Sequence, residues 1–288
     1  MPEIAYVNGV FGPIAEAQVS IEDRGFQFGD GIYEVLFRYD GHLFMPDEHM
    51  ARLRTSAAEI DLPYDFDANP LLPIITEGLS RSGFADAIVY IQITRGVAPR
   101  SHCYQPGMTP TVVMTFKQRP ALSPELVRRG ASVMTTIDER WSRCFVKAIT
   151  LLPNVLAKTG AVRRGFDDAI FVTESGEARE CTSANLYIVH DGAIQFPPRN
   201  HSVLHGITQL VVLDCAKRIG APTIEGVIGT DDLRRADEVF MSSTAVEVLG
   251  ITSIDGTAVT DGNVGPITRE LHEAFLNSVK TGRLSESA

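Results

Sequence analysis

Lys147 is the residue of this sequence whose surroundings best suit an amine nucleophile. It lies between the largely apolar stretches 144–146 and 148–152, whereas Lys217 and Lys280 lie in polar surroundings typical of helix surfaces. Apolar surroundings disfavour the ammonium form, so they lower the pKa of a lysine and free its amine for attack. A lysine at the end of a strand, with its charged group extended into water, would have the same pattern. This stretch alone leaves both interpretations open.

Three further groups of residues offer the contacts that a phosphorylated heterocycle needs. Glu180 follows a hairpin signal, and its carboxylate is suited to keep a ring nitrogen protonated. Gly206-Ile207-Thr208 and Ser243-Thr244 offer hydroxyl groups and the free backbone N–H groups of a helix start, which suit a phosphate. Arg52 would add a bidentate contact to that phosphate.

Pyridoxal phosphate requires this inventory: a lysine for its aldehyde, a carboxylate for its pyridine nitrogen and an anion site for its phosphate. Each feature also has a simpler explanation. Glu180 resembles a solvated loop acid, Ser-Thr pairs usually cap helices, and Arg52 resembles a surface arginine. Their joint occurrence is harder to attribute to chance and favours a pyridoxal-phosphate site.

The composition is that of an ordinary globular enzyme. The chain has 288 residues, 44% hydrophobic and 22% charged, which is enough for two domains. A net charge of −10 without a long basic run argues against nucleic-acid binding. The four cysteines show no C-x-x-C spacing and no paired histidine pattern, so we expect no disulfides and no metal site. Because we find neither a signal peptide nor a membrane-length apolar run, we expect a cytoplasmic protein without membrane contact.

The first half of the sequence contains clear strand and turn signals. Asn8-Gly9 and Asp40-Gly41 are typical of tight turns between strands. Residues 32–39 have the aromatic and β-branched content of a strand, and further strands are expected at 87–94 and 111–117.

Two helices are expected among these strands. The second runs from Asn69-Pro70 to Gly83. Residues 22–31 contain a G-x-G pattern. A dinucleotide-binding loop would lead into a helix, and that pattern is absent here, so we expect residues 22–31 to form a shaped loop. The first helix is expected to be capped by Asp47 and to bury Met50, Leu53, Ala57 and Ile60.

The second half again combines strands and helices. A helix is expected to open at Gly206, with Leu210, Leu213 and Ile219 facing a core. Ser242-Ser243-Thr244 is expected to end a short strand and to precede a helical turn. The remaining predicted elements are strands at 131–136, 169–173, 185–190 and 238–241, and helices at 153–164 and 266–280.

The order of these elements predicts an α+β (mixed α/β) fold. Strands cluster early in each half and helices are interspersed, which argues against a doubly wound parallel sheet. We expect a small α/β domain at 1–119, a proline-containing interdomain linker at 120–124 and a larger cofactor-binding domain at 125–288.

Several motifs occur in an order that resembles the fold-type IV pyridoxal-phosphate enzymes, the superfamily of branched-chain and D-amino-acid aminotransferases. The similarity runs over nearly the whole chain and is greatest to the D-amino-acid transaminases. It implies a larger domain that is pseudo-barrel-like, and ping-pong transamination between an amino acid such as D-alanine and a 2-oxo acid such as 2-oxoglutarate or pyruvate. The motifs are EDRGFQFGDGIYEV (22–35), EHMARL (48–53), TRGVAPRSH (94–102), RWSRCFVKAITLLPNVLAK (140–158), ECTSAN (180–185), HGIT (205–208) and SST (242–244).

The resemblance assigns roles at the cofactor. Lys147 would be the Schiff-base lysine, which also moves the proton between the substrate Cα and the cofactor C4′, and Glu180 would pair with the pyridinium nitrogen. Ser183 would lie in a loop near the cofactor. The phosphate would be held by Arg52, Ile207, Thr208 and Thr244, with Ser243 next to them.

Substrate choice is implied to depend on Tyr33, Arg100 and His102. In D-amino-acid transaminases these residue types form a trap for the substrate α-carboxylate, and the R-x-H pair reaches over from the neighbouring subunit of a homodimer. A guanidinium binds carboxylate as a fork, and a phenol and an imidazole fill the remaining acceptor positions.

Two residues depart from the family pattern. Cys181 stands where D-transaminases usually have glycine, and His205 precedes the glycine of the phosphate site at a position that often carries a lysine. Both leave side-chain specificity open. The alternatives are a branched-chain L-amino-acid aminotransferase, an (R)-selective amine transaminase or an aminodeoxychorismate lyase of the same fold, and, from another class, a non-catalytic protein that binds pyridoxal phosphate.

Overall fold

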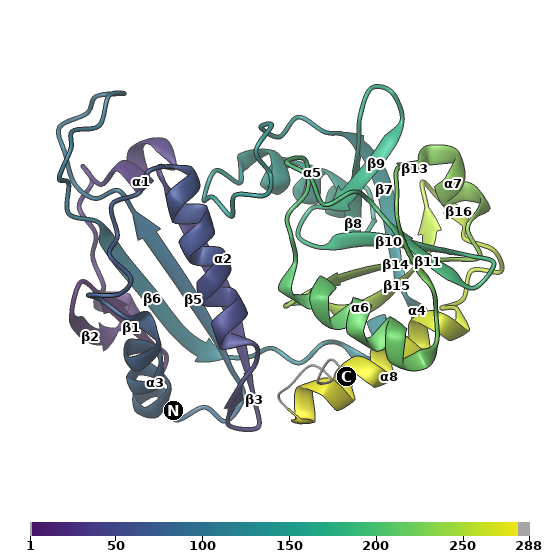
Figure 1. Ribbon diagram of the computed structural model, residues 1–288, viewed down its shortest axis with the longest axis horizontal. Coiled ribbons are helices and arrows are strands. Elements are labelled where there is room, and N and C mark those ends of the chain that lie inside the picture. The colour runs from purple at the N-terminus through teal and green to yellow at the C-terminus, as the bar shows by residue number, and fades with distance from the viewer. Residues whose placement is uncertain (1, 282–288) are drawn as a thin grey trace. The chain divides into compact units, whose positions relative to one another are not determined.

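The structure is a computed structural model that describes residues 2–281. Within these residues the chain divides into two compact units, which can be followed by colour in Figure 1. The first unit contains the residues up to Pro120 together with Val146–Thr150, and the second contains Ala121–Phe145 together with the residues from Leu151 onward. The short segment 146–150, which includes Lys147, therefore packs with the first unit, although the sequence boundaries had grouped it with residues 125–288.

The first unit is built on a six-stranded sheet in the order β2-β1-β6-β5-β3-β4, in which each pair is antiparallel. Both predicted tight turns are confirmed. Asn8 and Gly9 have φ of 45° and 99°, and Asp40 and Gly41 have φ of 44° and 84°, a left-handed pair that matches the twist of a hairpin. The strands are β1 (Ile4–Val7), β2 (Val10–Pro13), β3 (Gly31–Tyr39), β4 (His42–Leu43), β5 (Ala87–Thr94) and β6 (Thr111–Gln118).

Two longer helices pack on this sheet: α2 (Pro46–Glu59) on β3, and α3 (Leu71–Ser82) on β1 and β6. Gly78 lets α3 approach closely, because a Cβ there would lie 2.1 Å from the Phe116 ring. The predicted cap of α2 was wrong. Asp47 lies within the first turn, and Met45 at φ 52° precedes Pro46, whose fixed φ suits a helix start. The residues that α2 buries are His49, Leu53, Ser56 and Ala57, so only two of the four predicted inward residues are fully buried.

Residues 24–28 form a short helix, α1 (Arg24–Phe28), where a loop was expected; a single 3-10 turn, η1 (Ile14–Glu16), precedes it. Asp23 Oδ1 accepts a hydrogen bond from the Gly25 N–H at 2.8 Å, and Gly29 ends the helix at φ 69°. Local capping at both ends thus creates a helical turn without the apolar periodicity on which the sequence prediction relied.

The second unit is built on a ten-stranded sheet whose central strands close into a ring. The order is β12-β11-β10-β14-β15-β7-β8-β9-β13, and the tenth strand, β16, pairs with β15. A further pairing of β9 with β10 closes the path from β10 through β14, β15, β7 and β8. An apolar core that includes Val133, Ile170 and Leu186 fills its interior. The expected α+β fold with a barrel-like larger part is confirmed. The strands are β7 (Ala131–Ile137), β8 (Asp168–Val172), β9 (Glu177–Cys181), β10 (Asn185–His190), β11 (Ala193–Phe196), β12 (Thr223–Glu225), β13 (Ile228–Gly229), β14 (Glu238–Ser243), β15 (Glu247–Ile254) and β16 (Thr257–Ala258).

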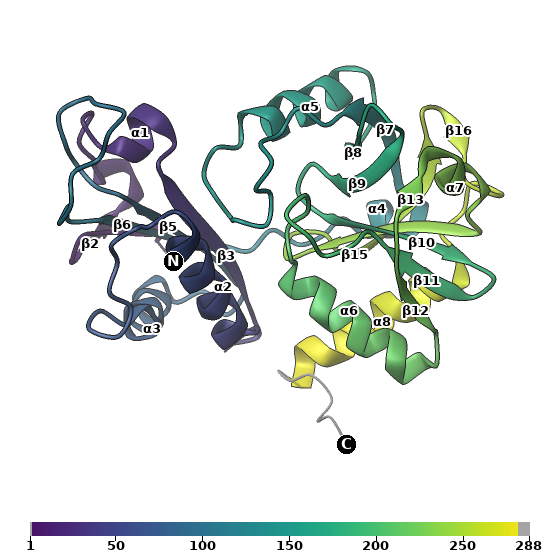
Figure 2. The same cartoon turned by 45° about the horizontal axis from the view of Figure 1, so that its top comes forward.

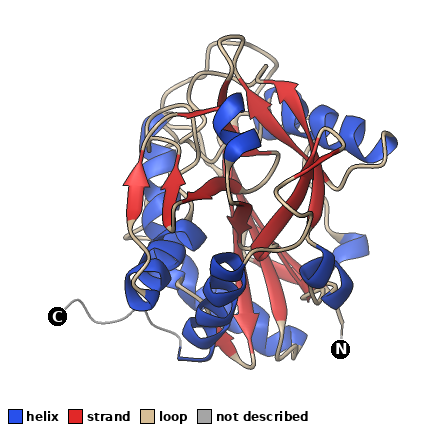
Figure 3. Cartoon of the chain, turned by 90° about the vertical axis from the view of Figure 1, so that its right-hand side faces the viewer, coloured by secondary structure: helices blue, strands red, loops and turns tan. Residues whose placement is uncertain are grey.

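Helices, blue in Figure 3, pack on these strands, which are red. In Figure 2, α6 and α8 lie side by side; α6 packs on β14 and α8 on β15. The predicted inward face of α6 was wrong, because Val211, Val212 and Cys215 are buried instead. Residues 244–246 form a turn after Ser243, and the strand β15 begins at Glu247. The helices are α4 (Pro124–Arg129), α5 (Leu152–Arg163), α6 (Ile207–Ile219), α7 (Thr230–Arg235) and α8 (Pro266–Thr281).

None of the helices in the described part of the chain has the length and apolar character needed to cross a bilayer.

Candidate active site

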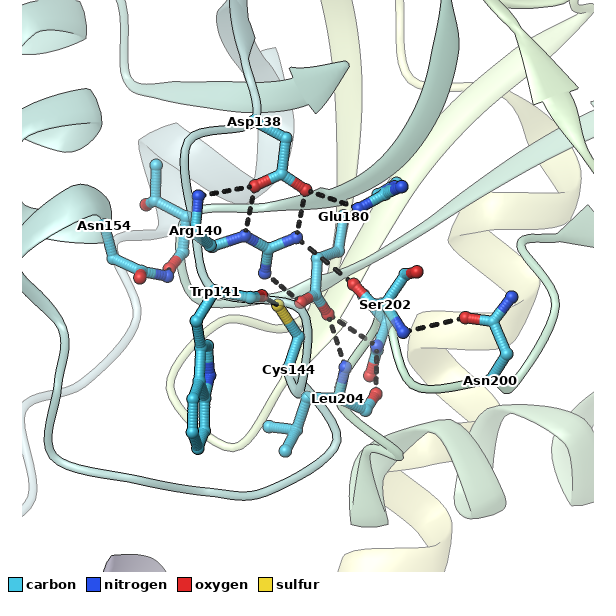
Figure 4. A network of polar contacts seen from close by, with 12 residues as sticks. Asp138, Arg140, Trp141, Cys144, Asn154, Glu180, Asn200, Ser202 and Leu204 are labelled. Carbon is cyan, nitrogen blue, oxygen red and sulfur yellow. Dashed lines mark hydrogen bonds and ion pairs between the residues drawn. The ribbon is translucent and has the colours of Figure 1, made fainter. Parts of the chain in front are cut away.

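Glu180 lies on β9 at the point where the ring of strands closes, opposite Asn185 of β10. Its carboxylate is buried and accepts three hydrogen bonds. Oε2 accepts from the Asn185 side-chain amide at 3.3 Å. Oε2 also accepts from the Leu204 N–H at 3.1 Å, and Oε1 accepts from the Arg140 guanidinium (Figure 4). The acid is therefore fixed from three directions.

Arg140 connects Glu180 to a second buried acid, Asp138. The guanidinium Nε and Nη2 each lie 2.9 Å from an Asp138 oxygen, and the guanidinium carbon lies 4.3 Å above the Phe171 ring. Arg179 also contacts Asp138, at 3.2 Å. We call Asp138, Arg140, Arg179 and Glu180 the Glu180 network. It contains two carboxylates and two guanidinium groups, so its formal charge is balanced.

Burial and the charge of Arg140 act in opposite directions on the two acids of this network. Burial raises the pKa of Glu180, and the nearby positive charge of Arg140 opposes that shift. Burial acts on Asp138 in the same direction, but hydrogen bonds and charge from Arg140 outweigh it and leave the pKa of Asp138 lowered. Burial raises the pKa of Cys144 to about 11, so this thiol stays protonated at neutral pH. A protonated ring nitrogen next to Glu180 would be stabilised by the ionised carboxylate.

Asn185 links Glu180 to the start of α6. Its side-chain N–H also donates to the Leu204 carbonyl at 2.8 Å. Its Oδ1 lies so close to Gly206 that a Cβ at this glycine would come within 2.0 Å of it. Glycine at this position therefore allows β10 and the segment before α6 to pack together.

The first turn of α6 has the features of an anion site. Gly206 is its N-cap and provides no side-chain cap, and both Ile207 and Thr208 are buried. Ser243 and Thr244 belong to the same region, because Ser242 pairs with Asn185 in the register of β14 and β10, and α6 packs on β14. Helix N–H groups and hydroxyl groups form a donor set that fits a phosphate dianion.

Ser183 lies in the loop between β9 and β10 and is exposed. Its neighbour Thr182 is anchored, since its hydroxyl donates to Asp168 at 2.6 Å and its carbonyl accepts from Asn154 at 2.8 Å. The loop is thus fixed by Thr182, and the Ser183 side chain extends toward solvent.

Lys147 belongs to a segment that adds to the edge of β3 in the first unit. The Tyr33 N–H donates to the Lys147 carbonyl at 2.9 Å, and the Lys147 N–H donates to Ser56 Oγ at 3.1 Å. The side chain is half-buried, with Nζ 4.2 Å from the centre of the Tyr33 ring. No described carboxylate forms an ion pair with this amine, so the lysine is held in position while its terminal nitrogen stays available.

Arg52 is engaged by a buried acid that the sequence prediction missed. Its Nε and Nη2 bind the two oxygens of Glu34 at 2.7 and 2.9 Å, and His49 Nδ1 lies 2.7 Å from Glu34 Oε2. Burial would raise the pKa of Glu34, but Arg52 and His49 together hold it well below its usual range. Burial lowers the pKa of His49, which Glu34 opposes. The buried carboxylate of Glu34 is thus a bidentate partner of Arg52 in this structure.

The three predicted substrate residues lie on two elements of the first unit. Tyr33, on β3, lies 5.8 Å from Tyr90 between ring centres. Arg100 and His102, on the loop after β5, both contact Phe28: the Arg100 guanidinium carbon lies 4.9 Å from the ring centre and the His102 ring lies 5.6 Å away, edge-on.

The structure brings the predicted residues together in two groups. Glu180, Ile207, Thr208 and Ser243 gather in the second unit, whereas Lys147, Tyr33 and Arg52 belong to the first. Sequence reasoning missed Arg140 and Asn185 as partners of Glu180, although both lie inside the quoted motifs.

The two departures from the family pattern have different environments. Cys181 belongs to the apolar core of the second unit, and burial raises the pKa of its thiol. His205 lies at the surface side of the segment before α6, with Nε2 3.1 Å from the Asn200 carbonyl.

Comparison with known proteins gives a consistent result. D-alanine aminotransferase of Staphylococcus haemolyticus is 41% identical over 277 residues, covering 96% of this chain and 98% of that protein. D-alanine aminotransferase of Bacillus licheniformis is 41% identical over 283 residues, covering 98% and 97%. Among solved structures, an Escherichia coli branched-chain amino acid aminotransferase superposes with a TM-score of 0.92 at 26% identity, over 99% of this chain and 97% of that one.

A T.th. branched-chain amino acid aminotransferase, solved with pyridoxamine 5′-phosphate, superposes with a TM-score of 0.88 at 29% identity and covers 97% of this chain and 95% of that one. Residues 31–254 match the family described as amino-transferase class IV, whose members use pyridoxal 5′-phosphate. The chain therefore belongs to the class IV aminotransferases.

Proposed function

We propose that this protein transfers the amino group of D-amino acids such as D-alanine to 2-oxo acids such as 2-oxoglutarate or pyruvate, by a ping-pong mechanism with pyridoxal 5′-phosphate. The observation that carries this proposal is 39–41% identity to D-alanine aminotransferases over 92–98% of the chain. The R-x-H loop at Arg100–His102 supports the choice of D-amino acids.

The donors and acceptors of the second unit fit this cofactor. Glu180 is a buried carboxylate, suited to a protonated pyridine nitrogen, and the first turn of α6 lacks a side-chain cap, as an anion site requires. When bound, the cofactor supplies a carbonyl that exchanges with the amino group and a ring that takes up electrons from the substrate Cα. The residues proposed to hold it are Lys147, Glu180, Arg52, Ile207, Thr208, Ser243, Thr244 and Ser183.

Lys147 is the proposed catalytic residue. Its amine would hold the cofactor through the aldehyde, and the freed amine would move a proton between the substrate Cα and the cofactor C4′. The absence of a carboxylate partner among the described residues suits both tasks, since an ion pair would hold the nitrogen in its protonated form.

Substrate binding is proposed to use Tyr33, Arg100 and His102 for the α-carboxylate. We propose a cytoplasmic homodimer in which Arg100 and His102 of each chain act in the site of the other. We propose residues 1–119 as the small domain, 120–124 as the linker and 125–288 as the cofactor-binding domain, of which the segment 146–150 packs with the first unit.

Branched-chain L-amino-acid transamination is the second candidate, because solved enzymes of that activity superpose on nearly the whole chain with TM-scores of 0.88 to 0.92. Their identity of 26–29% is lower than the 41% to D-alanine aminotransferases, which favours the D-enantiomer. An (R)-selective amine transaminase and an aminodeoxychorismate lyase have less support. A non-catalytic protein that binds the cofactor has the least support. Binding alone would require neither Lys147 nor Glu180, and both residues are present.

The experiment is an absorption spectrum of the purified protein before and after D-alanine, with L-alanine in a parallel sample. Conversion of the cofactor band by D-alanine alone supports the proposal. Conversion by the L-enantiomer alone would replace it with the second candidate, and the absence of any cofactor band after addition of pyridoxal phosphate would refute both.

A further inference from the structure

The segment 99–107, which contains Arg100 and His102, is an exposed loop after β5. Among the residues that the structure describes, both hydrogen bonds that attach this loop to the rest of the first unit come from one side chain, Arg24 of α1. Its Nη1 donates to the Ser101 carbonyl at 2.5 Å and its Nη2 to the His102 carbonyl at 3.3 Å. The backbone of the loop is thus held at the two residues that follow Arg100.

Arg24 is itself rigidly held. Its side chain is only 5% exposed, and its Nε lies 2.7 Å from Asp30 Oδ2. The same oxygen pairs with Arg95 at 2.9 Å. Arg95 in turn donates to the carbonyls of Ile60 at 2.6 Å and Asp61 at 2.7 Å, just after α2. The guanidinium fork of Arg24 therefore projects from a buried ion-pair network rather than from a mobile side chain.

The same short helix also contacts the side chains of the loop. Phe28 has the Arg24 guanidinium carbon 4.8 Å from its ring centre and that of Arg100 at 4.9 Å, with the His102 ring edge-on. A guanidinium over an aromatic face and an edge-on ring pair are favourable arrangements. Phe28 thus contacts both Arg100 and His102, which are proposed to bind the substrate carboxylate.

The helix is fixed to β5, so it forms a firm support. Asp23 caps α1 and accepts from the Thr94 hydroxyl at 2.9 Å. At Gly25 a Cβ would lie 2.2 Å from Thr94 Cγ2, which shows how closely α1 approaches the strand.

From this arrangement we infer that Arg24 is a positioning residue for substrate binding: it does not bind the carboxylate but holds the Arg100–His102 loop in the conformation that does. The inference rests on the proposed D-amino-acid transamination. A preformed loop saves the cost of ordering Arg100 and His102 when substrate binds, so the loss of Arg24 should appear in KM more than in kcat. Arginine is required because one planar group serves Asp30 and two carbonyls at once, which a lysine cannot do.

The test compares Arg24→Lys and Arg24→Met with Arg54→Met. Arg54 is a matched control, since it also pairs with a carboxylate (Asp67) and lies over an aromatic ring (Phe66), away from the loop. We expect KM for D-alanine to rise by at least about tenfold in both Arg24 variants, with a smaller change in kcat, an unchanged cofactor band and an unaffected control. Arg24→Lys keeps a cation for Asp30, so it decides the question if Arg24→Met does not fold.

Trypsin cleavage after Arg100 gives a second measurement that does not depend on turnover. We expect the Arg100–Ser101 bond to be cut faster in the Arg24 variants than in the wild type and the control. A KM within about twofold of wild type together with unchanged cleavage overturns the inference. If the wild type does not transaminate D-alanine, the proposed function fails and the cleavage rates alone test the role of Arg24 in holding the loop.

Discussion

Glu180 and Asn185 face each other across the strand pair that closes the ring of strands in the second unit. The Asn185 amide donates both to Glu180 Oε2 and to the Leu204 carbonyl, so one side chain joins the buried acid to the segment leading into α6. The proposed contact to the ring nitrogen and the proposed phosphate site therefore share a support. A change at either is expected to affect retention of the cofactor.

Lys147→Ala is expected to remove the covalent link to the cofactor and to lower turnover of D-alanine by at least about 10²-fold, the lower range for losing a proton-transfer group. The change is readily measured, because the visible band of the covalently bound cofactor disappears. Lys217→Ala is the control, since Lys217 is exposed in the last turn of α6. Near wild-type turnover in Lys147→Ala would contradict the assignment of this lysine.

Arg140→Met tests whether the Glu180 network keeps a buried carboxylate ionised. Removing the cation leaves Glu180 and Asp138 without their main partner, and breaking a buried ion pair costs about 3–5 kcal/mol of unfolding free energy. Burial already raises the pKa of Glu180, and loss of Arg140 raises it further. A carboxyl group whose pKa is higher in the folded protein than in the unfolded chain destabilises the fold as the pH rises from the unfolded pKa to the folded pKa.

The destabilisation of Arg140→Met should therefore be larger at pH 8 than at pH 5, as measured by urea unfolding. Arg128→Met serves as the control, because its ion pair with Glu125 is exposed and worth little. An equal loss of stability at both pH values would show that Glu180 does not titrate in response to Arg140.

The sequence was informative where local signals decide the structure. Asn8-Gly9 and Asp40-Gly41 form the expected turns, and β5 has the predicted bounds, because backbone preference and side-chain alternation act within a few residues. β9, with the sequence EAREC, was not foreseen, since it lacks β-branched and aromatic residues and exists through pairing with β8 and β10.

The candidate site followed the same rule. Lys147 and Glu180 could be identified from their residue types and motifs. The partners of Glu180 could not, because Arg140 and Leu204 lie 40 and 24 residues away in sequence and approach Glu180 only when the ring of strands closes. The buried Glu34–Arg52 pair was also not predicted. The sequence suggests that Arg52 is a surface residue of a helix, and only the packing of α2 on β3 brings it to Glu34.

Glu34→Gln is expected to destabilise the first unit by about 3–5 kcal/mol at neutral pH, because Arg52 would lose its buried carboxylate. The pKa of Glu34 is lowered in the fold: burial acts to raise it, but Arg52 and His49 prevail. An acid with a lowered pKa stabilises the folded state at pH values above the pKa that it has in the unfolded chain. This contribution is lost as the pH falls from that value through the pKa in the folded protein. The difference between wild type and variant should thus shrink in acid.

Thermal unfolding at pH 7 and at pH 3 measures this difference. Glu77→Gln is the matched control, since Glu77 also pairs with an arginine, Arg81, but both side chains are about half exposed. A difference that is the same at both pH values would mean that Glu34 is not ionised in the folded protein.

Gly206→Ala tests the shared support of the two proposed cofactor contacts. The backbone at Gly206 has φ −67°, which alanine adopts without strain, so the effect comes from contact alone. The new Cβ would lie 2.0 Å from Asn185 Oδ1 and must displace a side chain that holds both Glu180 and the Leu204 carbonyl. We expect the dissociation constant for pyridoxal phosphate to rise by roughly ten- to hundredfold, the range for losing a hydrogen bond to a charged group.

Titration of the cofactor-free protein with pyridoxal phosphate measures this constant. Gly160→Ala is the control, because Gly160 lies within α5 and its added methyl group meets open space. Alanine is the better helix former, so the control should bind the cofactor as the wild type does and unfold at the same or a higher temperature. Equal affinities for the two variants would mean that Asn185 does not couple Glu180 to the first turn of α6.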